Sequence, residues 1–271
     1  MSTKRKASPV RFTPLKRHIQ YNQHQNFMAD FDFGGTERLP HEVVFREHTK
    51  RLVELINSHA PNLEPHGKKK FIVMAMAWLT NFDILKALGR AKRRGVFVAV
   101  VTQKEDFLRP DNEDHTQEEW RAQLRKLYDA LGSYCGITVN NLIASYASPA
   151  LPDFRGPVYE GDQDDHIGSV RCVGNNNSCK SPSFPRMHHK FVVFGSETGG
   201  RWHEEKMEPE FVWTGSFNAS NASEKSFENA VILHSREISM RFFQEFCLMY
   251  MVSEPLDWTS EWMAPTLEFG T

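Results

Sequence analysis

The sequence has no long hydrophobic run. Its most apolar stretches, such as FIVMAMAWL at residues 71–79 of 271, fall far short of the roughly 20 residues that span a bilayer. The first residues also lack the pattern of a secretory signal. We therefore expect no membrane association and a cytoplasmic location.

An excess of charge of either sign is also missing. The formal net charge is −1, although 25% of the residues are charged. This balance gives no global attraction to nucleic acid or to an anionic membrane, so any site for an anion must be local. The hydrophobic content of 40% is sufficient to fill a core, which indicates a globular protein.

Cysteine is scarce and irregularly spaced. The four residues, Cys135, Cys172, Cys179 and Cys247, do not form the framework of a secreted disulfide-rich protein. A disulfide or metal clip between Cys172 and Cys179 is the alternative, but a zinc site needs further ligands at a recognisable spacing. We expect free thiols, no metal site and no cofactor.

The N-terminal segment differs in composition from the rest. Residues 1–38 begin with KRK at 4–6, have no acidic residue before Asp30, and show no apolar periodicity. We expect a flexible basic tail, which is either a solvated terminus, a phosphate-binding arm or a targeting sequence. Residues 39–271 are expected to form a single domain with a loop insertion at about 148–185, where proline, glycine, acidic residues and an NNN tract gather.

The remaining sequence alternates between helical and strand patterns, which predicts an α/β fold. Helices are expected at 41–60, 81–95, 112–135 and 238–252, and strands at 69–80, 96–102, from 137, and at 189–194, 210–216 and 227–233. The two apolar strands joined by the helix at 81–95 form a βαβ unit, which implies a parallel pair.

The stretch RMHHKFVVF at 186–194 places cationic side chains at the start of an apolar strand. Because a strand alternates its faces, His188 and Lys190 are expected on one side and His189 on the other. The spacing His-x-Lys occurs three times in the chain, at 48, 66 and 188, so the spacing alone is weak. The third copy differs from the others because it opens a strand and further polar motifs follow it.

The first of these motifs is TGSFNAS at 214–220, and SFENAVIL follows at 226–233. Gly215 can let the backbone approach an anion, and Ser216 and Asn218 offer short hydrogen-bonding groups on alternate positions. Together with His188 and Lys190 they are typical of a phosphate site.

This pattern, HHK followed by TGSFN and FEN, resembles the phospholipase D superfamily over about residues 186–233. The resemblance implies an αβα sandwich with a mixed, largely parallel central sheet flanked by helices. It also implies a metal-free phosphodiesterase reaction in which His188 is the nucleophile and Lys190 stabilises charge on the phosphate, with Ser216 and Asn218 as supports. Neutral imidazole is nucleophilic near pH 7 and fixed cations stabilise a charged transition state, so these roles agree with the chemistry.

The sequence departs from the superfamily pattern at one position. The aspartate of HxKxxxxD is replaced by Gly195. Orientation of the histidine then requires another carboxylate, and we expect Glu228 of SFEN to serve.

The superfamily reaction needs two histidines, one as nucleophile and one as general acid, whereas this chain has one complete motif. We therefore expect a homodimer in which His188 of each subunit contributes to a shared site. The expected substrate is DNA or RNA, since the basic tail and the cluster AKRRG at 91–95 can contact phosphates. The alternatives are a phospholipid phosphodiesterase and a non-catalytic module that binds phosphate or nucleic acid.

Overall fold

The structure is a computed structural model that describes residues 31–32, 41–60, 69–103, 108, 117–132, 168–173, 186–198, 206–251 and 253–256. Most of the expected basic tail, and the strand expected from residue 137, lie outside this part of the chain. Within it, no helix is both long and apolar enough to cross a membrane.

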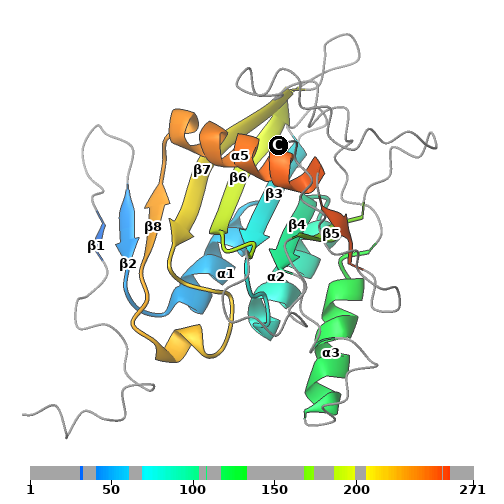
Figure 1. Cartoon of the computed structure of the whole chain (residues 1–271). Coiled ribbons are helices and arrows are strands. Elements are labelled where there is room, and N and C mark those ends of the chain that lie inside the picture. Colours follow the sequence, from blue (N-terminus) through cyan, green and yellow to red (C-terminus); the bar gives the residue numbers. More distant parts are fainter. Residues whose placement is uncertain are drawn as a thin grey trace, which may run out of the picture.

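The described residues form a central nine-stranded sheet with the order β1-β2-β8-β7-β6-β3-β4-β5-β9 (Figure 1). Its strands are β1 (Phe31–Asp32), β2 (Glu42–Val44), β3 (Lys69–Met76), β4 (Phe97–Gln103), β5 (Val170–Val173), β6 (Lys190–Thr198), β7 (Lys206–Gly215), β8 (Ala230–Leu233) and β9 (Glu254–Pro255). The helices are α1 (His48–Ser58), α2 (Phe82–Arg93), α3 (Glu118–Asp129) and α5 (Arg236–Met251), with a short 3₁₀ turn at Ser223–Lys225.

The sheet is mixed, as expected, but the expectation that it is largely parallel is wrong. Only β3 with β4, and β4 with β5, pair in parallel within the described residues. The other pairs are antiparallel, including β3 with β6 and β6 with β7. The reason is the connectivity: β6, β7 and β8 follow one another in the chain as antiparallel neighbours, whereas the crossover through α2 makes β3 and β4 parallel.

The predicted βαβ unit is confirmed by β3, α2 and β4. Asn81 begins α2 as its N-cap, where its side-chain oxygen accepts hydrogen bonds from the backbone N–H groups of Asp83 (2.9 Å) and Ile84 (3.2 Å). The helix is followed by Gly95 at φ 88°, a left-handed conformation that suits glycine at the end of a helix. Asn81 thus defines the turn between β3 and α2, and Gly95 defines the turn between α2 and β4.

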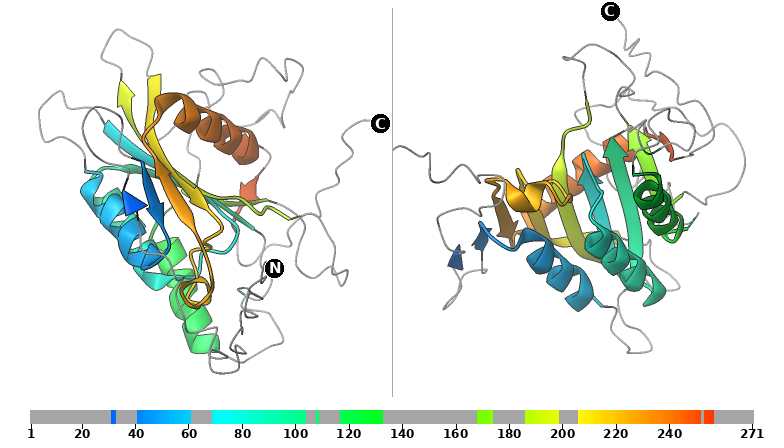
Figure 2. Two further views of the ribbon diagram at one scale, coloured as in Figure 1. Left: turned by 90° about the vertical axis from the view of Figure 1, so that its left-hand side faces the viewer. Right: turned by 90° about the horizontal axis from the view of Figure 1, so that it is seen from below.

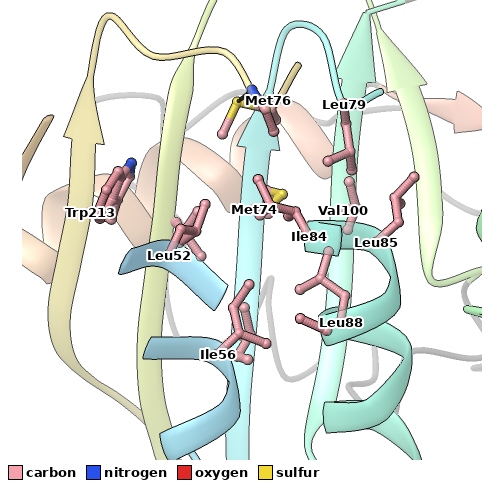
Figure 3. Packing of buried hydrophobic residues seen from close by; sticks show 14 of the residues in the cluster. Leu52, Ile56, Met74, Met76, Leu79, Ile84, Leu85, Leu88, Val100 and Trp213 are labelled. Atoms are coloured by element: carbon pink, nitrogen blue, oxygen red, sulfur yellow. Dashed lines mark hydrogen bonds between the residues drawn. The ribbon is translucent and has the colours of Figure 1, made fainter. Parts of the chain in front are cut away.

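The helices cover both faces of the sheet, which gives an αβα sandwich (Figure 2). Helices α1, α2 and α3 lie on one face and α5 lies on the other. On the first face, Leu52 and Ile56 of α1 and Leu88 of α2 point toward Met74 and Val100 of the strands (Figure 3). On the second face, α5 buries Phe243, Phe246 and Cys247 against a separate set of strand residues. The two faces of each central strand are therefore apolar, which explains the continuous hydrophobic runs in the sequence.

Two expected boundaries differ from the structure. The helix expected at 41–60 is a short strand, β2, followed by α1, because Glu47 adopts a left-handed conformation that interrupts the chain between them. The loop expected at about 148–185 contains β5, which pairs with β4 in the sheet. Only four residues form this strand, too few to stand out from the polar residues around it.

Candidate active site

The motif residues meet at one end of the sheet. Lys190 at the start of β6 pairs with Met76 at the end of β3, and Phe191 pairs with Thr214 near the end of β7. Gly215 at the end of β7 pairs with Ala230 at the start of β8. The antiparallel order of these strands thus brings the HHK, GSFN and FEN segments together, although they span about 40 residues of sequence.

The expected separation of the two histidines is confirmed by their contacts. The His188 ring lies 5.8 Å from the ring of Trp78, centroid to centroid. His189 instead contacts Glu245 of α5, with 3.1 Å between Nε2 and Oε1. Lys190 lies on the side of β6 that faces α1 and α2, as do the core residues that follow it at alternate positions. His189 therefore pairs with Glu245 at the surface on the α5 side of the sheet, and His188 and Lys190 lie on the side of α1 and α2.

The surroundings of His188 favour the neutral imidazole. Burial lowers its pKa below the ordinary value of 6.5, and the positive charges of Lys190, Arg186 and His189 lower it further. An unprotonated nitrogen is the form that can attack a phosphorus atom. The electrostatics of this end of the sheet thus agree with the nucleophilic role that the motif implies.

Lys190 is largely buried, with 9% of its surface exposed. Its ammonium group donates a hydrogen bond to the backbone oxygen of His188 at 2.9 Å. Burial lowers the pKa of Lys190, and the carboxylate of Glu228 opposes that change. The ammonium group of Lys190 is therefore bound to the backbone of the residue that carries the imidazole, so the cation lies close to His188.

Glu228 makes its hydrogen bond with Ser216 rather than with His188. The Ser216 hydroxyl donates to a carboxylate oxygen of Glu228. The same hydroxyl oxygen accepts from the backbone N–H of Asn229 at 3.0 Å, and the backbone N–H of Ser216 donates to the Asn229 carbonyl at 2.9 Å. The charges that act on His188 do not include Glu228 among the described residues. Among the described residues the structure thus connects Glu228 with Ser216 and Lys190, and it shows no hydrogen bond between Glu228 and His188.

Asn218 is a buried polar residue of the site. Its side chain is 7% exposed, and its Oδ1 atom accepts no hydrogen bond from the described residues. Such an atom is costly to bury without a donor, so Asn218 Oδ1 is an acceptor that the described residues leave available at this end of the sheet. Ser216 is exposed and Asn218 is buried because β7 ends at Gly215, and strand alternation no longer applies beyond it.

Gly215 has a packing reason for being glycine. A Cβ atom at this position would lie 2.1 Å from the backbone oxygen of Asn229 and 2.7 Å from the Cα of Ala230. The expected reason was close approach of the backbone to an anion. The close approach that the structure shows is to β8, and it holds the GSFN and FEN segments together.

Gly195, at the position of the motif aspartate, lies well inside β6. A Cβ atom there would be 2.3 Å from Cζ of Phe71 and 2.5 Å from the backbone oxygen of Glu208. The carbonyl of Gly195 accepts a hydrogen bond from Nε2 of His59 at 2.9 Å. The space that an aspartate would need is therefore occupied by the core.

Two residues of the site were not identified from the sequence. Trp78 contacts His188, and Gln103 accepts a hydrogen bond from the backbone N–H of Met187 at 2.8 Å. Trp78 follows the end of β3, and Gln103 is the last residue of β4. Both strands are predicted from the sequence. The carboxyl ends of parallel strands share one edge of a sheet, and that rule was the available signal.

No protein-family model matches the chain. It is 29% identical over 215 residues to the uncharacterized protein L381 of Acanthamoeba polyphaga mimivirus, covering 76% of this chain and 68% of that protein. Among solved structures it is similar to Nuc of Salmonella typhimurium, a phospholipase D family member, with a TM-score of 0.41 and 18% identity over 76% of this chain and 88% of that chain. It is also similar to NucT from Helicobacter pylori, with a TM-score of 0.43 and 14% identity over 79% of this chain and 97% of that chain.

Proposed function

We propose that this protein is a metal-independent phosphodiesterase that cleaves the backbone of DNA or RNA. The observation that carries the proposal is the convergence of His188, Lys190 and Asn218 at one end of the sheet. A nucleophile with a lowered pKa and a nearby buried cation are groups that a phosphoryl-transfer site requires. The unsatisfied Oδ1 atom of Asn218 is an acceptor, and its proposed role is to accept a hydrogen bond from an imidazole N–H rather than to bind phosphate.

The proposed reaction has two steps. A neutral imidazole nitrogen of His188 attacks phosphorus, the bond from phosphorus to the leaving oxygen breaks, and that oxygen takes a proton from a general acid. Water then attacks the phosphohistidine with the conjugate base of that acid accepting its proton, which restores His188 and releases the phosphate monoester. Lys190 stabilises the negative charge on the non-bridging oxygens in both steps.

The general acid is proposed to be His188 of a partner subunit. Of the two adjacent histidines of the motif, His188 lies on the side of Lys190, whereas His189 contacts Glu245 of α5. A twofold axis at this end of the sheet would bring two copies of His188 to one phosphate. Glu228 accepts a hydrogen bond from Ser216 of its own chain. The same axis would bring this carboxylate to the imidazole of His188 in the other chain, where it could orient the ring.

Nucleic acid is the proposed substrate in preference to lipid. A lipid phosphodiesterase would need an exposed apolar surface to hold it at a membrane. Over the described part of the chain the exposed large hydrophobic side chains are Phe227, before β8, and Ile238, in α5. Two such residues on different elements are fewer than an anchoring surface needs.

The test is an assay of the purified protein, in the presence of EDTA, on plasmid DNA, single-stranded DNA, RNA and lipid vesicles. We expect cleavage of nucleic acid that survives EDTA and loss of turnover in His188→Asn. When the reaction is stopped by alkaline denaturation, which preserves the acid-labile bond between phosphorus and histidine, we expect a phosphoryl group on His188. Abolition by EDTA with rescue by magnesium or zinc would exclude this mechanism. Binding to nucleic acid without turnover would support a non-catalytic module, and Gly195 in place of the aspartate is the feature of the chain that favours that alternative.

A further inference from the structure

Trp78 lies on a short segment that is fixed at both ends to the site. On one side, the backbone N–H of Ala77 donates to the His189 carbonyl at 2.9 Å. On the other side, Leu79 forms a parallel bridge with Ala219, whose carbonyl also accepts from the N–H groups of Thr80 and Asn81 at 2.8 Å each. The backbone of Trp78 is thus held between the segment that contains His188 and the end of the GSFNA segment.

The indole of Trp78 projects from this fixed backbone to His188. The two rings are nearly perpendicular, at 81°, with their centroids 5.8 Å apart, an edge-to-face geometry that aromatic rings favour. Ala77 and Leu79 are each 1% exposed, whereas Trp78 is only half-buried. The indole therefore lies at the surface of the core, at the point where the imidazole of His188 emerges.

Among the described residues of the same subunit, Trp78 is the side chain that contacts the ring of His188. His188 precedes β6, so the strand ladder does not fix its side chain, and no hydrogen bond to its imidazole is formed by the described residues. The motif aspartate is replaced by Gly195, and Glu228 binds Ser216. An imidazole at such a position would sample several rotamers unless a neighbouring side chain restricts it.

We propose that Trp78 is a positioning residue that holds the His188 imidazole in the orientation required for attack on phosphorus. This inference rests on the proposed function for its kinetic consequence, but the restriction of His188 by Trp78 can be measured without any substrate. A misplacement of about 1 Å in a reacting group is sufficient to cost on the order of a hundredfold in rate. The indole would thus supply part of the orientation that a carboxylate provides in the usual motif.

The experiment compares Trp78→Leu and Trp78→Phe in the full chain. Leucine keeps an apolar side chain but removes the ring, and phenylalanine keeps an aromatic face. Trp120→Leu is the matched control, because Trp120 is also half-buried and stacks on a ring, that of Phe82, at 6.0 Å, but belongs to α3. Unfolding by denaturant is measured for each variant so that a loss of fold is separated from a loss of positioning.

Two readouts are taken, and the first needs no substrate. The ring resonances of His188, assigned by their disappearance in His188→Ala, are followed by NMR as a function of pH. Trp78→Leu should shift them and raise the pKa of His188 toward 6.5, because burial is the largest cause of its lowering. Trp120→Leu should leave both unchanged, and Trp78→Phe should restore most of the wild-type behaviour.

The second readout is kinetic. Trp78→Leu should lower kcat by about ten- to a hundredfold with little change in KM, and should move the acid limb of the pH profile upward. Unchanged His188 resonances in Trp78→Leu, or equal effects from Trp120→Leu, would overturn the positioning role. If the wild-type protein has no turnover, the proposed function fails, whereas the NMR titration still decides whether Trp78 holds His188.

Discussion

Introducing an aspartate at position 195 would complete the sequence pattern of the superfamily motif. We nevertheless expect the substitution to lower the stability of the folded protein. If the motif alone decided the outcome, Gly195→Asp would increase turnover by supplying the missing carboxylate. The structure predicts the opposite, because Gly195 is buried in β6 and the first side-chain atom has no room. The simpler variant Gly195→Ala isolates this effect, since it adds only that atom.

The magnitude follows from the two contacts. The added Cβ would lie 2.3 Å from the Phe71 ring and 2.5 Å from the backbone oxygen of Glu208. Phe71 is fully buried and the second atom belongs to a neighbouring strand, so neither can move aside without disturbing the sheet. Overpacking of this kind costs about 1–3 kcal/mol. For Gly195→Ala, about 2 kcal/mol corresponds to a decrease in Tm of roughly 4–8 °C in a domain of this size. Gly195→Asp should cost more, because it also buries an unpaired carboxylate.

The assay is unfolding by denaturant and by heat, monitored by circular dichroism. Gly89→Ala is the matched control: a Cβ at Gly89 in α2 would meet only Arg93, at an ordinary contact distance of 3.7 Å. Because alanine suits a helix interior better than glycine, this control should stabilise the protein by about 0.5–1 kcal/mol. Equal stability of Gly195→Asp and wild type, with increased turnover, would refute the steric reasoning and restore the usual role to position 195.

The remaining predictions concern the histidines and Glu228. His188→Ala should abolish turnover while His189→Ala retains most of it, because His189 contacts Glu245 on the other face of the sheet; equal loss in two folded variants would contradict the assignment of faces. Burial lowers the pKa of His59 in the folded state below the ordinary value of 6.5. Just below pH 6.5 the unfolded state therefore binds more protons than the folded state, so the free energy of unfolding should fall as the pH decreases through that value. In His59→Gln, which keeps an N–H donor, this part of the pH dependence should disappear from denaturant unfolding curves. Glu228→Gln should keep the fold but lower turnover by on the order of a hundredfold, measured as initial rates, and an unchanged rate would remove Glu228 from the site. Mixing His188→Ala with Glu228→Gln subunits should give no heterodimer near the wild-type rate, and full activity would exclude the shared site.

Much of the fold could be predicted because its signals are local. The apolar runs of β3 and β4, with a capped amphipathic helix between them, specify a parallel pair without further information. The antiparallel pairing of β3 with β6 could not be obtained in this way. These strands are more than 100 residues apart in sequence, and buried strands have the same apolar composition in either direction.

The site could be predicted only where its residues lie close together in the sequence. The face of His188 follows from strand alternation, and its contacts agree. The partner of Glu228 could not be predicted, because it depends on a turn between β7 and β8 that places the carboxylate beside Ser216. The contribution of Trp78 could not be predicted either, since a tryptophan at the end of a strand looks the same whether it packs in the core or against a functional side chain.

The contrast between Gly195 and Trp78 follows from where each lies along the strands. Gly195 is at an irregular point of the β6–β7 ladder, where the register shifts and the facing residue is Pro209, which has no N–H to donate. The His59 imidazole donates to the carbonyls of Gly195 and Phe71 from Nε2, so that nitrogen carries a proton, and burial lowers the pKa of the ring, which favours its neutral form. This position is consequently part of the folded core, five residues from Lys190 in sequence and away from the phosphate site. Position 78 matches no motif, yet it contacts the proposed nucleophile, so the orientation of His188 depends more on the end of β3 than on the interior of β6.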